Sequence, residues 1–522
     1  MRRRPAQNAK LHSSENGQTR PPSLPQPNFL MNTSTNLKKS KLQQTAEDLE
    51  AEANTAALKG KAPNEALREL LETVHEEDFQ ELAKSYLEKK LCDAEGKPRK
   101  PTQREASVII TDHFIYSLKA RGSGLAIIDQ LPHAFLGDHW LPLDKDSILR
   151  AMGTFAQKIG HRVSDARHHF FREDLLKQLH CVADTIQADE SSIVVNFLNG
   201  TLRISDQGQE LHPHRREDAL TYVLPFDYEP EAECPMFDRF LDRVLPDEEC
   251  RTVLMEFFGW IFLRDLKLEK MMILYGSGHN GKSVVFDIIT ALLSKSNVSN
   301  LGLSTLEDPK RRTPMLGKLL NYGSEIKGNL DPDLLKNISS GEPLEFRYLF
   351  KDNFTSSNFA RLVFNANTLP TETECTDGFF RRFLIIPFEQ TITEDEKDPE
   401  LATKIIKHEL AGVMMRVLAG MKRVQQARAF SPCRKADQYL KAYQMESDTV
   451  AQFLEDAGYQ ISTDAIQAKG EFYQEYKEYC IMNGFRPLGN KNFSQRLERH
   501  HRIPNGKSGS LRYWRLEKNN NI

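Results

Sequence analysis

The sequence predicts a multidomain α/β protein, in which a central parallel sheet flanked by helices follows an α+β domain and precedes a smaller C-terminal module. A chain of 522 residues usually forms about three domains. The composition is globular, with 39% apolar residues, 27% charged residues and a formal net charge of −3. Residues 270–275 (KMMILY) form an apolar run that leads through a glycine-rich segment into the helical pattern of residues 284–293. A strand, a loop and a helix in this order are typical of α/β domains.

Two features of the sequence limit its class. No window approaches the roughly 18 apolar residues of a membrane span, and the basic N-terminus lacks the apolar stretch of a secretory signal. The seven cysteines are far apart and form no C-x-x-C pair, so neither a zinc ribbon nor a disulfide framework is expected. We therefore expect a soluble, cytoplasmic protein without a membrane partner. The near-neutral net charge does not exclude nucleic acid, because binding depends on where basic residues cluster.

The N-terminal half divides into three expected segments. Residues 1–62 are rich in polar and basic residues and predict a disordered tail, because they hold too little apolar surface to offset the entropy of folding. Residues 63–105 predict a helical segment and a linker. Residues 106–232 predict an α+β domain, since 192–198 is strand-like and an Asn-Gly turn follows at 199–200.

Three further segments complete the chain. Residues 233–269 have helical periodicity and predict a helical lead-in to the central domain. The central domain is expected at 270–430. Residues 431–522 predict helices followed by a basic hairpin.

A phosphate-binding loop is predicted directly after the apolar run. The motif G-x-x-x-x-G-K-[ST] is matched by Gly276, Ser277, Gly278, His279, Asn280, Gly281, Lys282 and Ser283. Glycines let backbone N–H groups turn toward phosphates, and the N-terminus of the following helix adds its positive dipole end. Lys282 would neutralise phosphate oxygens, and the hydroxyl of Ser283 would bind Mg²⁺. ATP and Mg²⁺ are therefore the expected ligands.

Polar residues follow later apolar runs in positions that suit nucleotide hydrolysis. Residues 318–325 (KLLNYGSE) end in Glu325, which would orient the attacking water and support the metal. Asn367 ends residues 360–367 (ARLVFNAN) and would contact the γ-phosphate. Arg381 and Arg382 precede another apolar strand, and either guanidinium suits a finger that reaches into a neighbouring subunit's ATP. Such a finger is worth about 10³ to 10⁵ in rate.

Taken in order, these segments resemble a superfamily 3 helicase, specifically the primase-helicase family of phages, plasmids and large DNA viruses. The resemblance rests on the loop at 276–283, Glu325, residues 341–352 (GEPLEFRYLFKD), residues 362–370 (LVFNANTLP) and residues 378–388 (GFFRRFLIIPF). Residues 195–200 and 222–235 are similar to the domain that precedes the ATPase in that family. The likeness therefore spans about residues 107–388.

The resemblance implies an AAA+-like ATPase that forms a ring, usually a hexamer, and moves along single-stranded DNA to unwind duplex. It implies nucleotide and Mg²⁺ contacts for Lys282 and Ser283. Glu325 would be the catalytic acid and a metal ligand, and Asn367 the polar sensor. One of Arg381 and Arg382 would be the finger supplied in trans. Ser324 departs from the family, in which an acid is common at that position.

The same resemblance makes residues 341–352 a hairpin that lines the central channel. Arg347 and Lys351 would grip DNA phosphates, while Phe346, Tyr348 or Phe350 would meet bases. Cations combined with aromatic rings are typical of sequence-tolerant binding to single strands. Leu349 lies where a basic residue is expected.

The C-terminal segment resembles a winged helix-turn-helix. Residues 485–501 predict a turn and a helix capped near Asn490 or Asn492, and residues 506–516 predict a hairpin. Basic residues are frequent in this region, and the expected contacts to duplex phosphates are Lys491, Arg496, Arg499, Lys507 and Arg512.

The leading hypothesis is an ATP-dependent DNA helicase that acts on single-stranded and forked DNA in the replication of a mobile element or virus, inside its host cell. An alternative is a nucleotide-switched DNA-binding initiator without sustained unwinding, which Ser324 favours. A third class, an ATPase that moves protein or packages DNA, is disfavoured by the hairpin and by the basic C-terminal region. The polar N-terminal segment predicts no primase active site on this chain, so a separate primase or polymerase is an expected partner.

Overall fold

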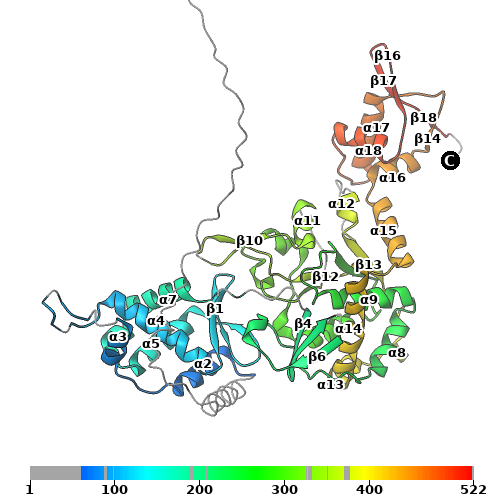
Figure 1. The fold of residues 1–522 in the computed structure, drawn as a ribbon. Coiled ribbons are helices and arrows are strands. Elements are labelled where there is room, and N and C mark those ends of the chain that lie inside the picture. The colour runs from blue at the N-terminus through cyan, green and yellow to red at the C-terminus, as the bar shows by residue number, and fades with distance from the viewer. Residues whose placement is uncertain are drawn as a thin grey trace, which may run out of the picture.

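The computed structural model describes residues 60–519, except 88–90, 94, 98, 185, 187–192, 206–207, 325, 327–331, 350 and 370–376. The expected tail at 1–62 lies almost wholly outside the described residues, and Glu325 and Phe350 lie outside them too. Among the described helices, none is long and apolar enough to cross a bilayer. Figure 1 shows the N-terminal helices beside a central α/β part and a C-terminal module that projects from it.

The N-terminal part packs helices against a small antiparallel sheet of order β1-β2-β3. Its elements are α2 (Pro63–Glu72), α3 (Phe79–Tyr86), α4 (Gln103–Lys119), β1 (Gly124–Ile128), β2 (Leu131–Phe135), β3 (Trp140–Pro142), α5 (Lys145–Lys158), α6 (Val163–Arg167) and α7 (His169–Val182). Their buried apolar side chains form one core that extends from Ala66 to Leu179. The helical segment expected at 63–105 therefore shares a core with the elements that follow it.

A second antiparallel sheet packs on the helices that lead into the central domain. It consists of β4 (Ile193–Phe197), β5 (Gly200–Ser205) and β6 (Gly208–His212), and the helices are α8 (Pro235–Val244) and α9 (Glu248–Trp260). The expected strand and turn are present, but the turn residues are 198–199, because Gly200 already pairs with Phe197 as the first residue of β5. The expected helical lead-in is two helices, with Pro246 between them.

The central domain contains a five-stranded parallel sheet of order β13-β7-β12-β9-β8. Its strands are β7 (Met271–Tyr275), β8 (Val298–Ser299), β9 (Leu320–Gly323), β12 (Arg361–Ala366) and β13 (Phe383–Pro387). The other elements are α10 (Lys282–Leu293), α11 (Pro332–Ser340), β10 (Leu344–Arg347), β11 (Asn353–Ser356), α12 (Asp377–Phe380), α13 (Leu401–His408) and α14 (Leu410–Ala427). The predicted parallel sheet flanked by helices is confirmed.

Alternate residues of the sheet enter two different cores. Leu274, Tyr322 and Val363 face the side covered by α9, α10 and α14. Ile273 and Phe364 face the opposite side, where residues of α11 and α12 pack. Both faces of the sheet are covered, which explains why its strands read as nearly continuous apolar runs in the sequence.

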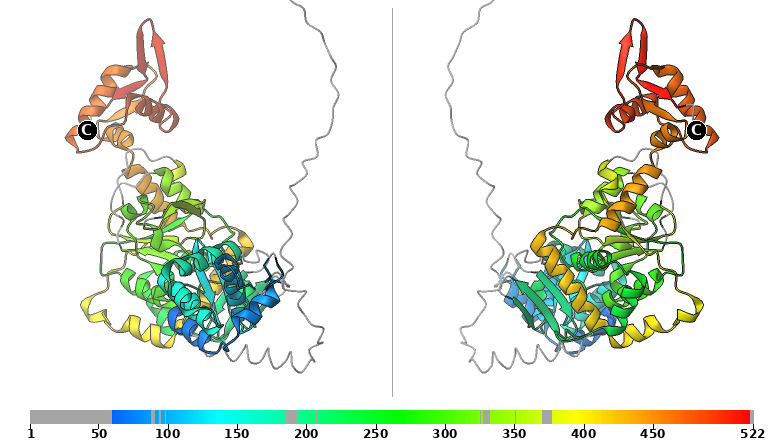
Figure 2. Two further views of the ribbon diagram at one scale, coloured as in Figure 1. Left: turned by 90° about the vertical axis from the view of Figure 1, so that its left-hand side faces the viewer. Right: turned by 90° about the vertical axis from the view of Figure 1, so that its right-hand side faces the viewer.

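The C-terminal module has its own core, built from residues between Val450 and Leu516. Its elements are α16 (Thr449–Asp456), β14 (Tyr459–Ile461), β15 (Gln467–Ala468), α17 (Lys469–Met482), α18 (Asn490–Arg499), β16 (Asn505–Ser508), β17 (Leu511–Trp514) and β18 (Leu516–Lys518), and α15 (Arg434–Glu446) leads into it. Figure 2 shows the predicted hairpin, β16–β17, at the outer end of the module. The helix begins at Asn490 as expected, but its N-cap is Gly489, so the cap is a glycine and not one of the two asparagines.

Candidate active site

The glycine-rich segment between β7 and α10 forms a tight loop. A Cβ atom on Gly276 would lie 2.2 Å from Asn280 Nδ2 and 2.5 Å from the carbonyl oxygen of Phe388. Gly281 is the N-cap of α10 with φ +86°, and a Cβ atom there would lie 2.7 Å from Val244 Cγ1. Glycine is therefore required at both positions, and the loop brings backbone N–H groups to the N-terminus of α10, where phosphates bind.

Lys282 and Asn280 hold this loop together. The buried Lys282 ammonium donates to the carbonyl oxygen of Gly276 at 2.6 Å and to Asn280 Oδ1 at 3.0 Å. Asn280 Nδ2 in turn donates to the carbonyl oxygen of Phe388 at 3.1 Å, directly after β13. Burial lowers the pKa of Lys282. The ammonium group is bonded to oxygen atoms only, and phosphate oxygens can replace them as acceptors.

The polar candidates of the neighbouring strands lie at the carboxyl edge of the sheet, the edge at which this loop begins. The backbone N–H of Gly276 donates to the carbonyl oxygen of Ala366 at 3.0 Å, so the exposed Asn367 follows the strand beside the loop. Ser324 is exposed directly after β9, which pairs with β12. Asn365, which sequence reasoning passed over, accepts from the hydroxyl of Tyr322 at 3.3 Å.

These groups fit a magnesium-bound triphosphate. The loop and Lys282 supply donors for phosphate oxygens, and the exposed Ser283 in the first turn of α10 offers a hydroxyl of the kind that Mg²⁺ accepts beside phosphates. Glu325, expected as the second metal ligand, lies outside the described residues. ATP as the substrate and Mg²⁺ at Ser283 are therefore compatible with the donor set.

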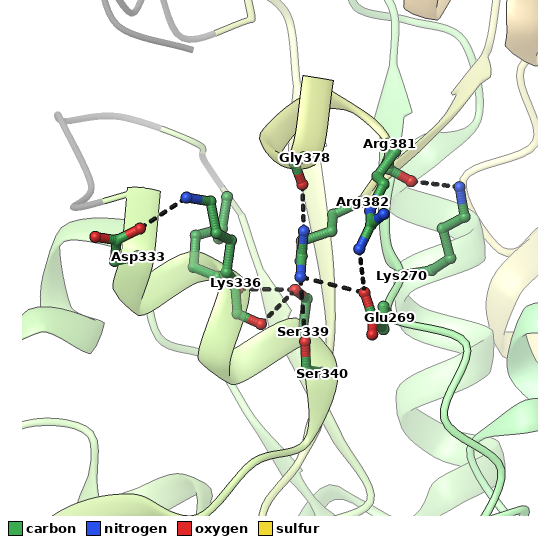
Figure 3. A network of polar contacts seen from close by, with 10 residues as sticks. Glu269, Lys270, Asp333, Lys336, Ser339, Ser340, Gly378, Arg381 and Arg382 are labelled. Atoms are coloured by element: carbon green, nitrogen blue, oxygen red, sulfur yellow. Dashed lines mark hydrogen bonds and ion pairs between the residues drawn. The ribbon is translucent and has the colours of Figure 1, made fainter. Parts of the chain in front are cut away.

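The two candidate finger arginines have different environments (Figure 3). Arg381 is 66% exposed, and its Nη2 lies 3.0 Å from Glu269 Oε2. Arg382 is only 8% exposed, and its Nη2 lies 3.2 Å from the same carboxylate oxygen. Arg382 also donates to the carbonyl oxygen of Gly378 and, at 3.4 Å, to Ser340 Oγ. Arg382 is therefore directed into the protein, and Arg381 is the accessible member of the pair.

Both arginines lie at the sheet edge opposite the phosphate-binding loop. Phe383, the first residue of β13, pairs with Met271, the first residue of β7, and the loop begins only after Tyr275. Five strand residues at about 3.3 Å each separate the two edges by roughly 16 Å. The guanidinium of Arg381 is thus remote from the loop of its own subunit.

The segment expected to line a channel is a β-hairpin, β10–β11. Arg347 and Lys351 are exposed on it, and Lys351 Nζ lies 5.7 Å from the centre of the Tyr348 ring. Phe346 is one of the three alternatives for a ring that meets bases, but its side chain is fully buried against Phe354. Leu349 is exposed at the tip.

The hairpin is attached to the N-terminal part through Asp129. This residue and Gln130 form the turn between β1 and β2, both with positive φ. Asp129 Oδ1 accepts from Ser356 Oγ at 2.7 Å, and Oδ2 accepts from Asn358 Nδ2 at 3.1 Å. The hydroxyl of Tyr348 also donates to its carbonyl oxygen at 3.4 Å. One aspartate therefore contacts both sides of the hairpin.

The basic candidates of the C-terminal module differ in accessibility. The exposed ones are Lys491, Arg499, Lys507 and Arg512. Lys507 and Arg512 lie directly opposite each other on β16 and β17, an arrangement of like charges that destabilises a hairpin unless an anion is near. Arg496 is instead 17% exposed and lies 3.5 Å from Asp448 Oδ2.

Sequence reasoning missed Glu269 and Asp129. Glu269 has φ +55°, an uncommon conformation for a non-glycine residue that is often found at functional sites. No local pattern distinguishes it from other charged residues of the KLEK segment at 267–270. The two-residue interval between the apolar runs around Asp129 was a visible turn signal, but not a signal for its contacts to the hairpin.

Comparisons with known proteins match three parts of the chain to protein families. Residues 42–246 match the family described as "D5 N terminal like", and residues 445–521 match "Poxvirus D5 protein-like". Residues 274–382, which contain the loop, Asn367 and both arginines, match "Family of unknown function (DUF5906)". The three matches follow one another along the chain.

Similar individual proteins come from invertebrate iridescent viruses. The protein named "Putative helicase 121R" of Invertebrate iridescent virus 3 is 25% identical over 230 residues, which are 41% of this chain and 24% of that protein. "Putative helicase 184R" of Invertebrate iridescent virus 6 is 24% identical over 235 residues, with the same coverage of both chains. The match thus spans about a quarter of these curated relatives. The solved C-terminal region of NrS-1 has a TM-score of 0.47 at 13% identity and covers 77% of this chain and 98% of its own.

Proposed function

Because this chain belongs to the D5-like family of superfamily 3 helicases, we propose that it is an ATP-driven, ring-forming DNA helicase. It translocates on single-stranded DNA and unwinds duplex during replication of a phage, plasmid or virus-like element. Lys282 binds the triphosphate of the ATP substrate, Asn367 contacts its γ-phosphate, and Glu325 acts as the catalytic acid. Mg²⁺, held at Ser283 and Glu325, neutralises charge on the phosphates.

One observation carries this proposal: the nucleotide loop and Arg381 lie at opposite edges of the same parallel sheet. An arginine that cannot reach the nucleotide of its own subunit can serve the nucleotide of the next, if the subunits associate head to tail. Head-to-tail contacts of this kind form a ring when the rotation between successive subunits closes. The arrangement therefore supports a homo-oligomeric ring, which we take to be a hexamer, with Arg381 as the finger.

The sheet order supports an AAA+-like core at 270–430, because β7, which leads into the loop, lies between β13, which follows the two arginines, and β12, which precedes Asn367. The separate core of the C-terminal module, with α18 followed by the β16–β17 hairpin, supports a winged-helix-like DNA-binding module within 431–522. The segments 63–105, 106–232 and 233–269 then form the part that precedes the ATPase.

DNA contacts are proposed at two places. Arg347 and Lys351 on the β10–β11 hairpin bind the single strand, with Tyr348 as the accessible ring. Lys491, Arg499, Lys507 and Arg512 bind duplex phosphates near a fork. Arg496 contributes mainly by holding Asp448, which caps α16. A separate primase or polymerase is the proposed partner for primer synthesis, and the host-cell cytoplasm is the proposed location.

A nucleotide-switched initiator without sustained unwinding is the second candidate, and the exposed Ser324 after β9 favours it. Two assays on the purified protein separate the candidates. A helicase hydrolyses ATP faster when single-stranded DNA is added and separates a forked substrate. An initiator binds ATP and DNA but leaves the forked substrate intact, and that result would contradict the helicase proposal.

A further inference from the structure

A small pocket at the amino edge of the central sheet is lined by four basic side chains. They are Arg264, Lys267, Lys318 and Arg361, and the pocket has a volume of about 60 Å³. Arg361 begins β12 and Lys318 lies two residues before β9, while Arg264 and Lys267 belong to the connection from α9 to β7. The lining contains no carboxylate. Three separate chain segments thus bring four positive charges to one point.

This charge is not neutralised at contact distance. Within the part of the chain that the structure describes, none of the four cations forms an ion pair with a carboxylate. Their partners are neutral oxygens: Arg264 Nη1 donates to Asn358 Oδ1 at 2.6 Å, and Lys318 Nζ donates to the carbonyl oxygen of Ser296. The nearest acids, Asp129 and Asp265, act on these cations only through space.

The positive charges of these side chains also repel one another. Burial lowers the pKa of Arg361 to about 10, and the neighbouring charge of Arg264 contributes to the shift. Burial also lowers the pKa of Lys318. A cluster of this kind is costly to the folded protein unless an anion binds there, because like charges in a partly buried site repel.

Arg361 has the most evident structural role of the four residues. It lies 4.0 Å from the centre of the Trp260 ring and donates to the carbonyl oxygen of Arg264 at 3.1 Å, so it holds the connection that follows α9. Lys267 is exposed, and its side chain has no such partner among the described residues. Lys267 therefore adds charge to the pocket without an evident packing function, and Lys318 adds a charge whose hydrogen bond goes to a neutral carbonyl oxygen.

The pocket lies between the β10–β11 hairpin and the arginine pair, to which the proposed function assigns DNA binding and the finger. On one side is Asn358, two residues after the β11 strand of the hairpin and bonded to Asp129. On the other side is Ser340, which accepts from Arg382 at 3.4 Å. A ligand bound here would contact both the base of the hairpin and the arginine network of Figure 3.

We propose that this pocket binds a phosphate group through Lys267, Lys318 and Arg264, a role additional to the loop and the hairpin. The proposal rests on the proposed function for the source of that phosphate. The bound phosphate group is either a backbone phosphate of the DNA strand at the base of the hairpin or a phosphate of the nucleotide bound by the adjacent subunit. Both sources present the same oxyanion chemistry, and guanidinium and ammonium groups recognise it.

The test compares the double variant Lys267→Gln/Lys318→Gln with the control Lys407→Gln/Lys422→Gln. The control removes the same charge from exposed positions on α13 and α14. Both double variants also carry Lys282→Ala, so that the phosphate-binding loop lacks its lysine and contributes little to phosphate binding. Thermal unfolding is then followed with increasing inorganic phosphate at constant ionic strength. We expect phosphate to raise the Tm of the control but not of the double variant. Equal stabilisation of both would overturn the proposal.

The source of the phosphate is distinguished with Lys282 intact. If it is DNA, the double variant binds a single-stranded oligonucleotide more weakly, and the slope of log affinity against log salt falls by about 0.7 per lost contact. If it is a nucleotide, the DNA-independent ATP turnover falls while that slope is unchanged. A double variant that matches the control in both assays would overturn the assignment to either source. Wild-type protein without DNA binding or ATP turnover would contradict the proposed function instead, and the phosphate titration would still test the pocket.

Discussion

Glu269 Oε2 lies 3.0 Å from Arg381 Nη2, and the same oxygen lies 3.2 Å from Nη2 of the buried Arg382. Glu269 lies two residues before β7, and β7 ends at the phosphate-binding loop. One strand therefore connects the carboxylate that holds both arginines with the loop that would hold the triphosphate. A shift of β7 when nucleotide binds would move both ends together.

The two arginines should respond differently to substitution. Arg381→Ala should reduce ATP turnover by about 10³-fold or more with little change in stability, because an exposed finger contributes only to the transition state. Arg382→Ala should lower the free energy of unfolding by about 1–3 kcal/mol, because it leaves the carbonyl oxygen of Gly378 and the hydroxyl of Ser340 without this donor and Glu269 with Arg381 alone. Steady-state turnover and thermal unfolding of both variants check this. Normal turnover in Arg381→Ala would exclude it as the finger.

The phosphate-binding loop predicts a second pair of effects. Lys282→Ala should abolish ATP turnover while the affinity for single-stranded DNA stays close to wild type. Asn280→Ala removes the bond to the carbonyl oxygen of Phe388 and one acceptor of Lys282, so it should weaken nucleotide binding by about tenfold. Steady-state ATP turnover and a titration with single-stranded DNA check the first variant, and titration with a fluorescent ATP analogue checks the second. A loop variant that loses DNA binding to the same extent would indicate misfolding instead.

Asp129 should control the order of the β10–β11 hairpin. Asp129→Ala removes the acceptors of Ser356 and Asn358, which together contribute about 1–3 kcal/mol to the attachment of the hairpin. Amide hydrogen exchange of β10 and β11 should therefore become faster, with no change at the phosphate-binding loop. Asp146→Ala, an exposed aspartate at the start of α5, is the matched control. Unchanged exchange in Asp129→Ala would mean that the hairpin is held by its own core.

The C-terminal module should lose stability in acid through Asp448. Burial raises the pKa of this carboxyl, but the hydrogen bond from His501 and the charge of Arg496 outweigh burial and hold the pKa below its usual range. A depressed carboxyl pKa contributes stability above the unfolded value near 4, and that stability is lost as the pH falls through the lower folded value. Asp448→Asn should therefore destabilise α16 at neutral pH and reduce its acid dependence below pH 4. Hydrogen exchange of α16 as a function of pH measures this, and an acid dependence equal to that of wild type would contradict it.

The parts that were predictable from the sequence are those set by local patterns. The apolar run before Gly276 and the periodicity after Lys282 sufficed to predict β7, the loop and α10. The alternation Leu344, Glu345, Phe346, Arg347 on β10 also shows that Phe346 faces the core with Leu344. This strand period excludes Phe346 from the three alternatives for a ring that meets bases, which also include Tyr348 and Phe350.

The parts that were not predictable depend on tertiary contacts. Arg381 and Arg382 are adjacent in the sequence and identical in chemistry, and only the packing of α12 against Ser340 directs one inward. Asp129 and Ser356 are 227 residues apart, and no local pattern pairs them. The pocket of four cations is similarly assembled from segments that are distant in the chain. The spacing of residues in the sequence therefore does not predict these parts of the candidate site, because they depend on side-chain contacts between distant segments.

The central claim is that each nucleotide site is shared by two subunits, and mixing two inactive proteins tests it most directly. Lys282→Ala lacks the loop lysine but keeps Arg381, and Arg381→Ala keeps the lysine but lacks the finger. In a randomly mixed ring, about one quarter of the sites combine an intact lysine with an intact finger from the neighbour. We predict that DNA-stimulated ATP turnover, absent from each variant alone, returns on mixing toward that fraction of wild type. A mixture as inactive as its components, under conditions in which mixed rings are demonstrated, would contradict the account.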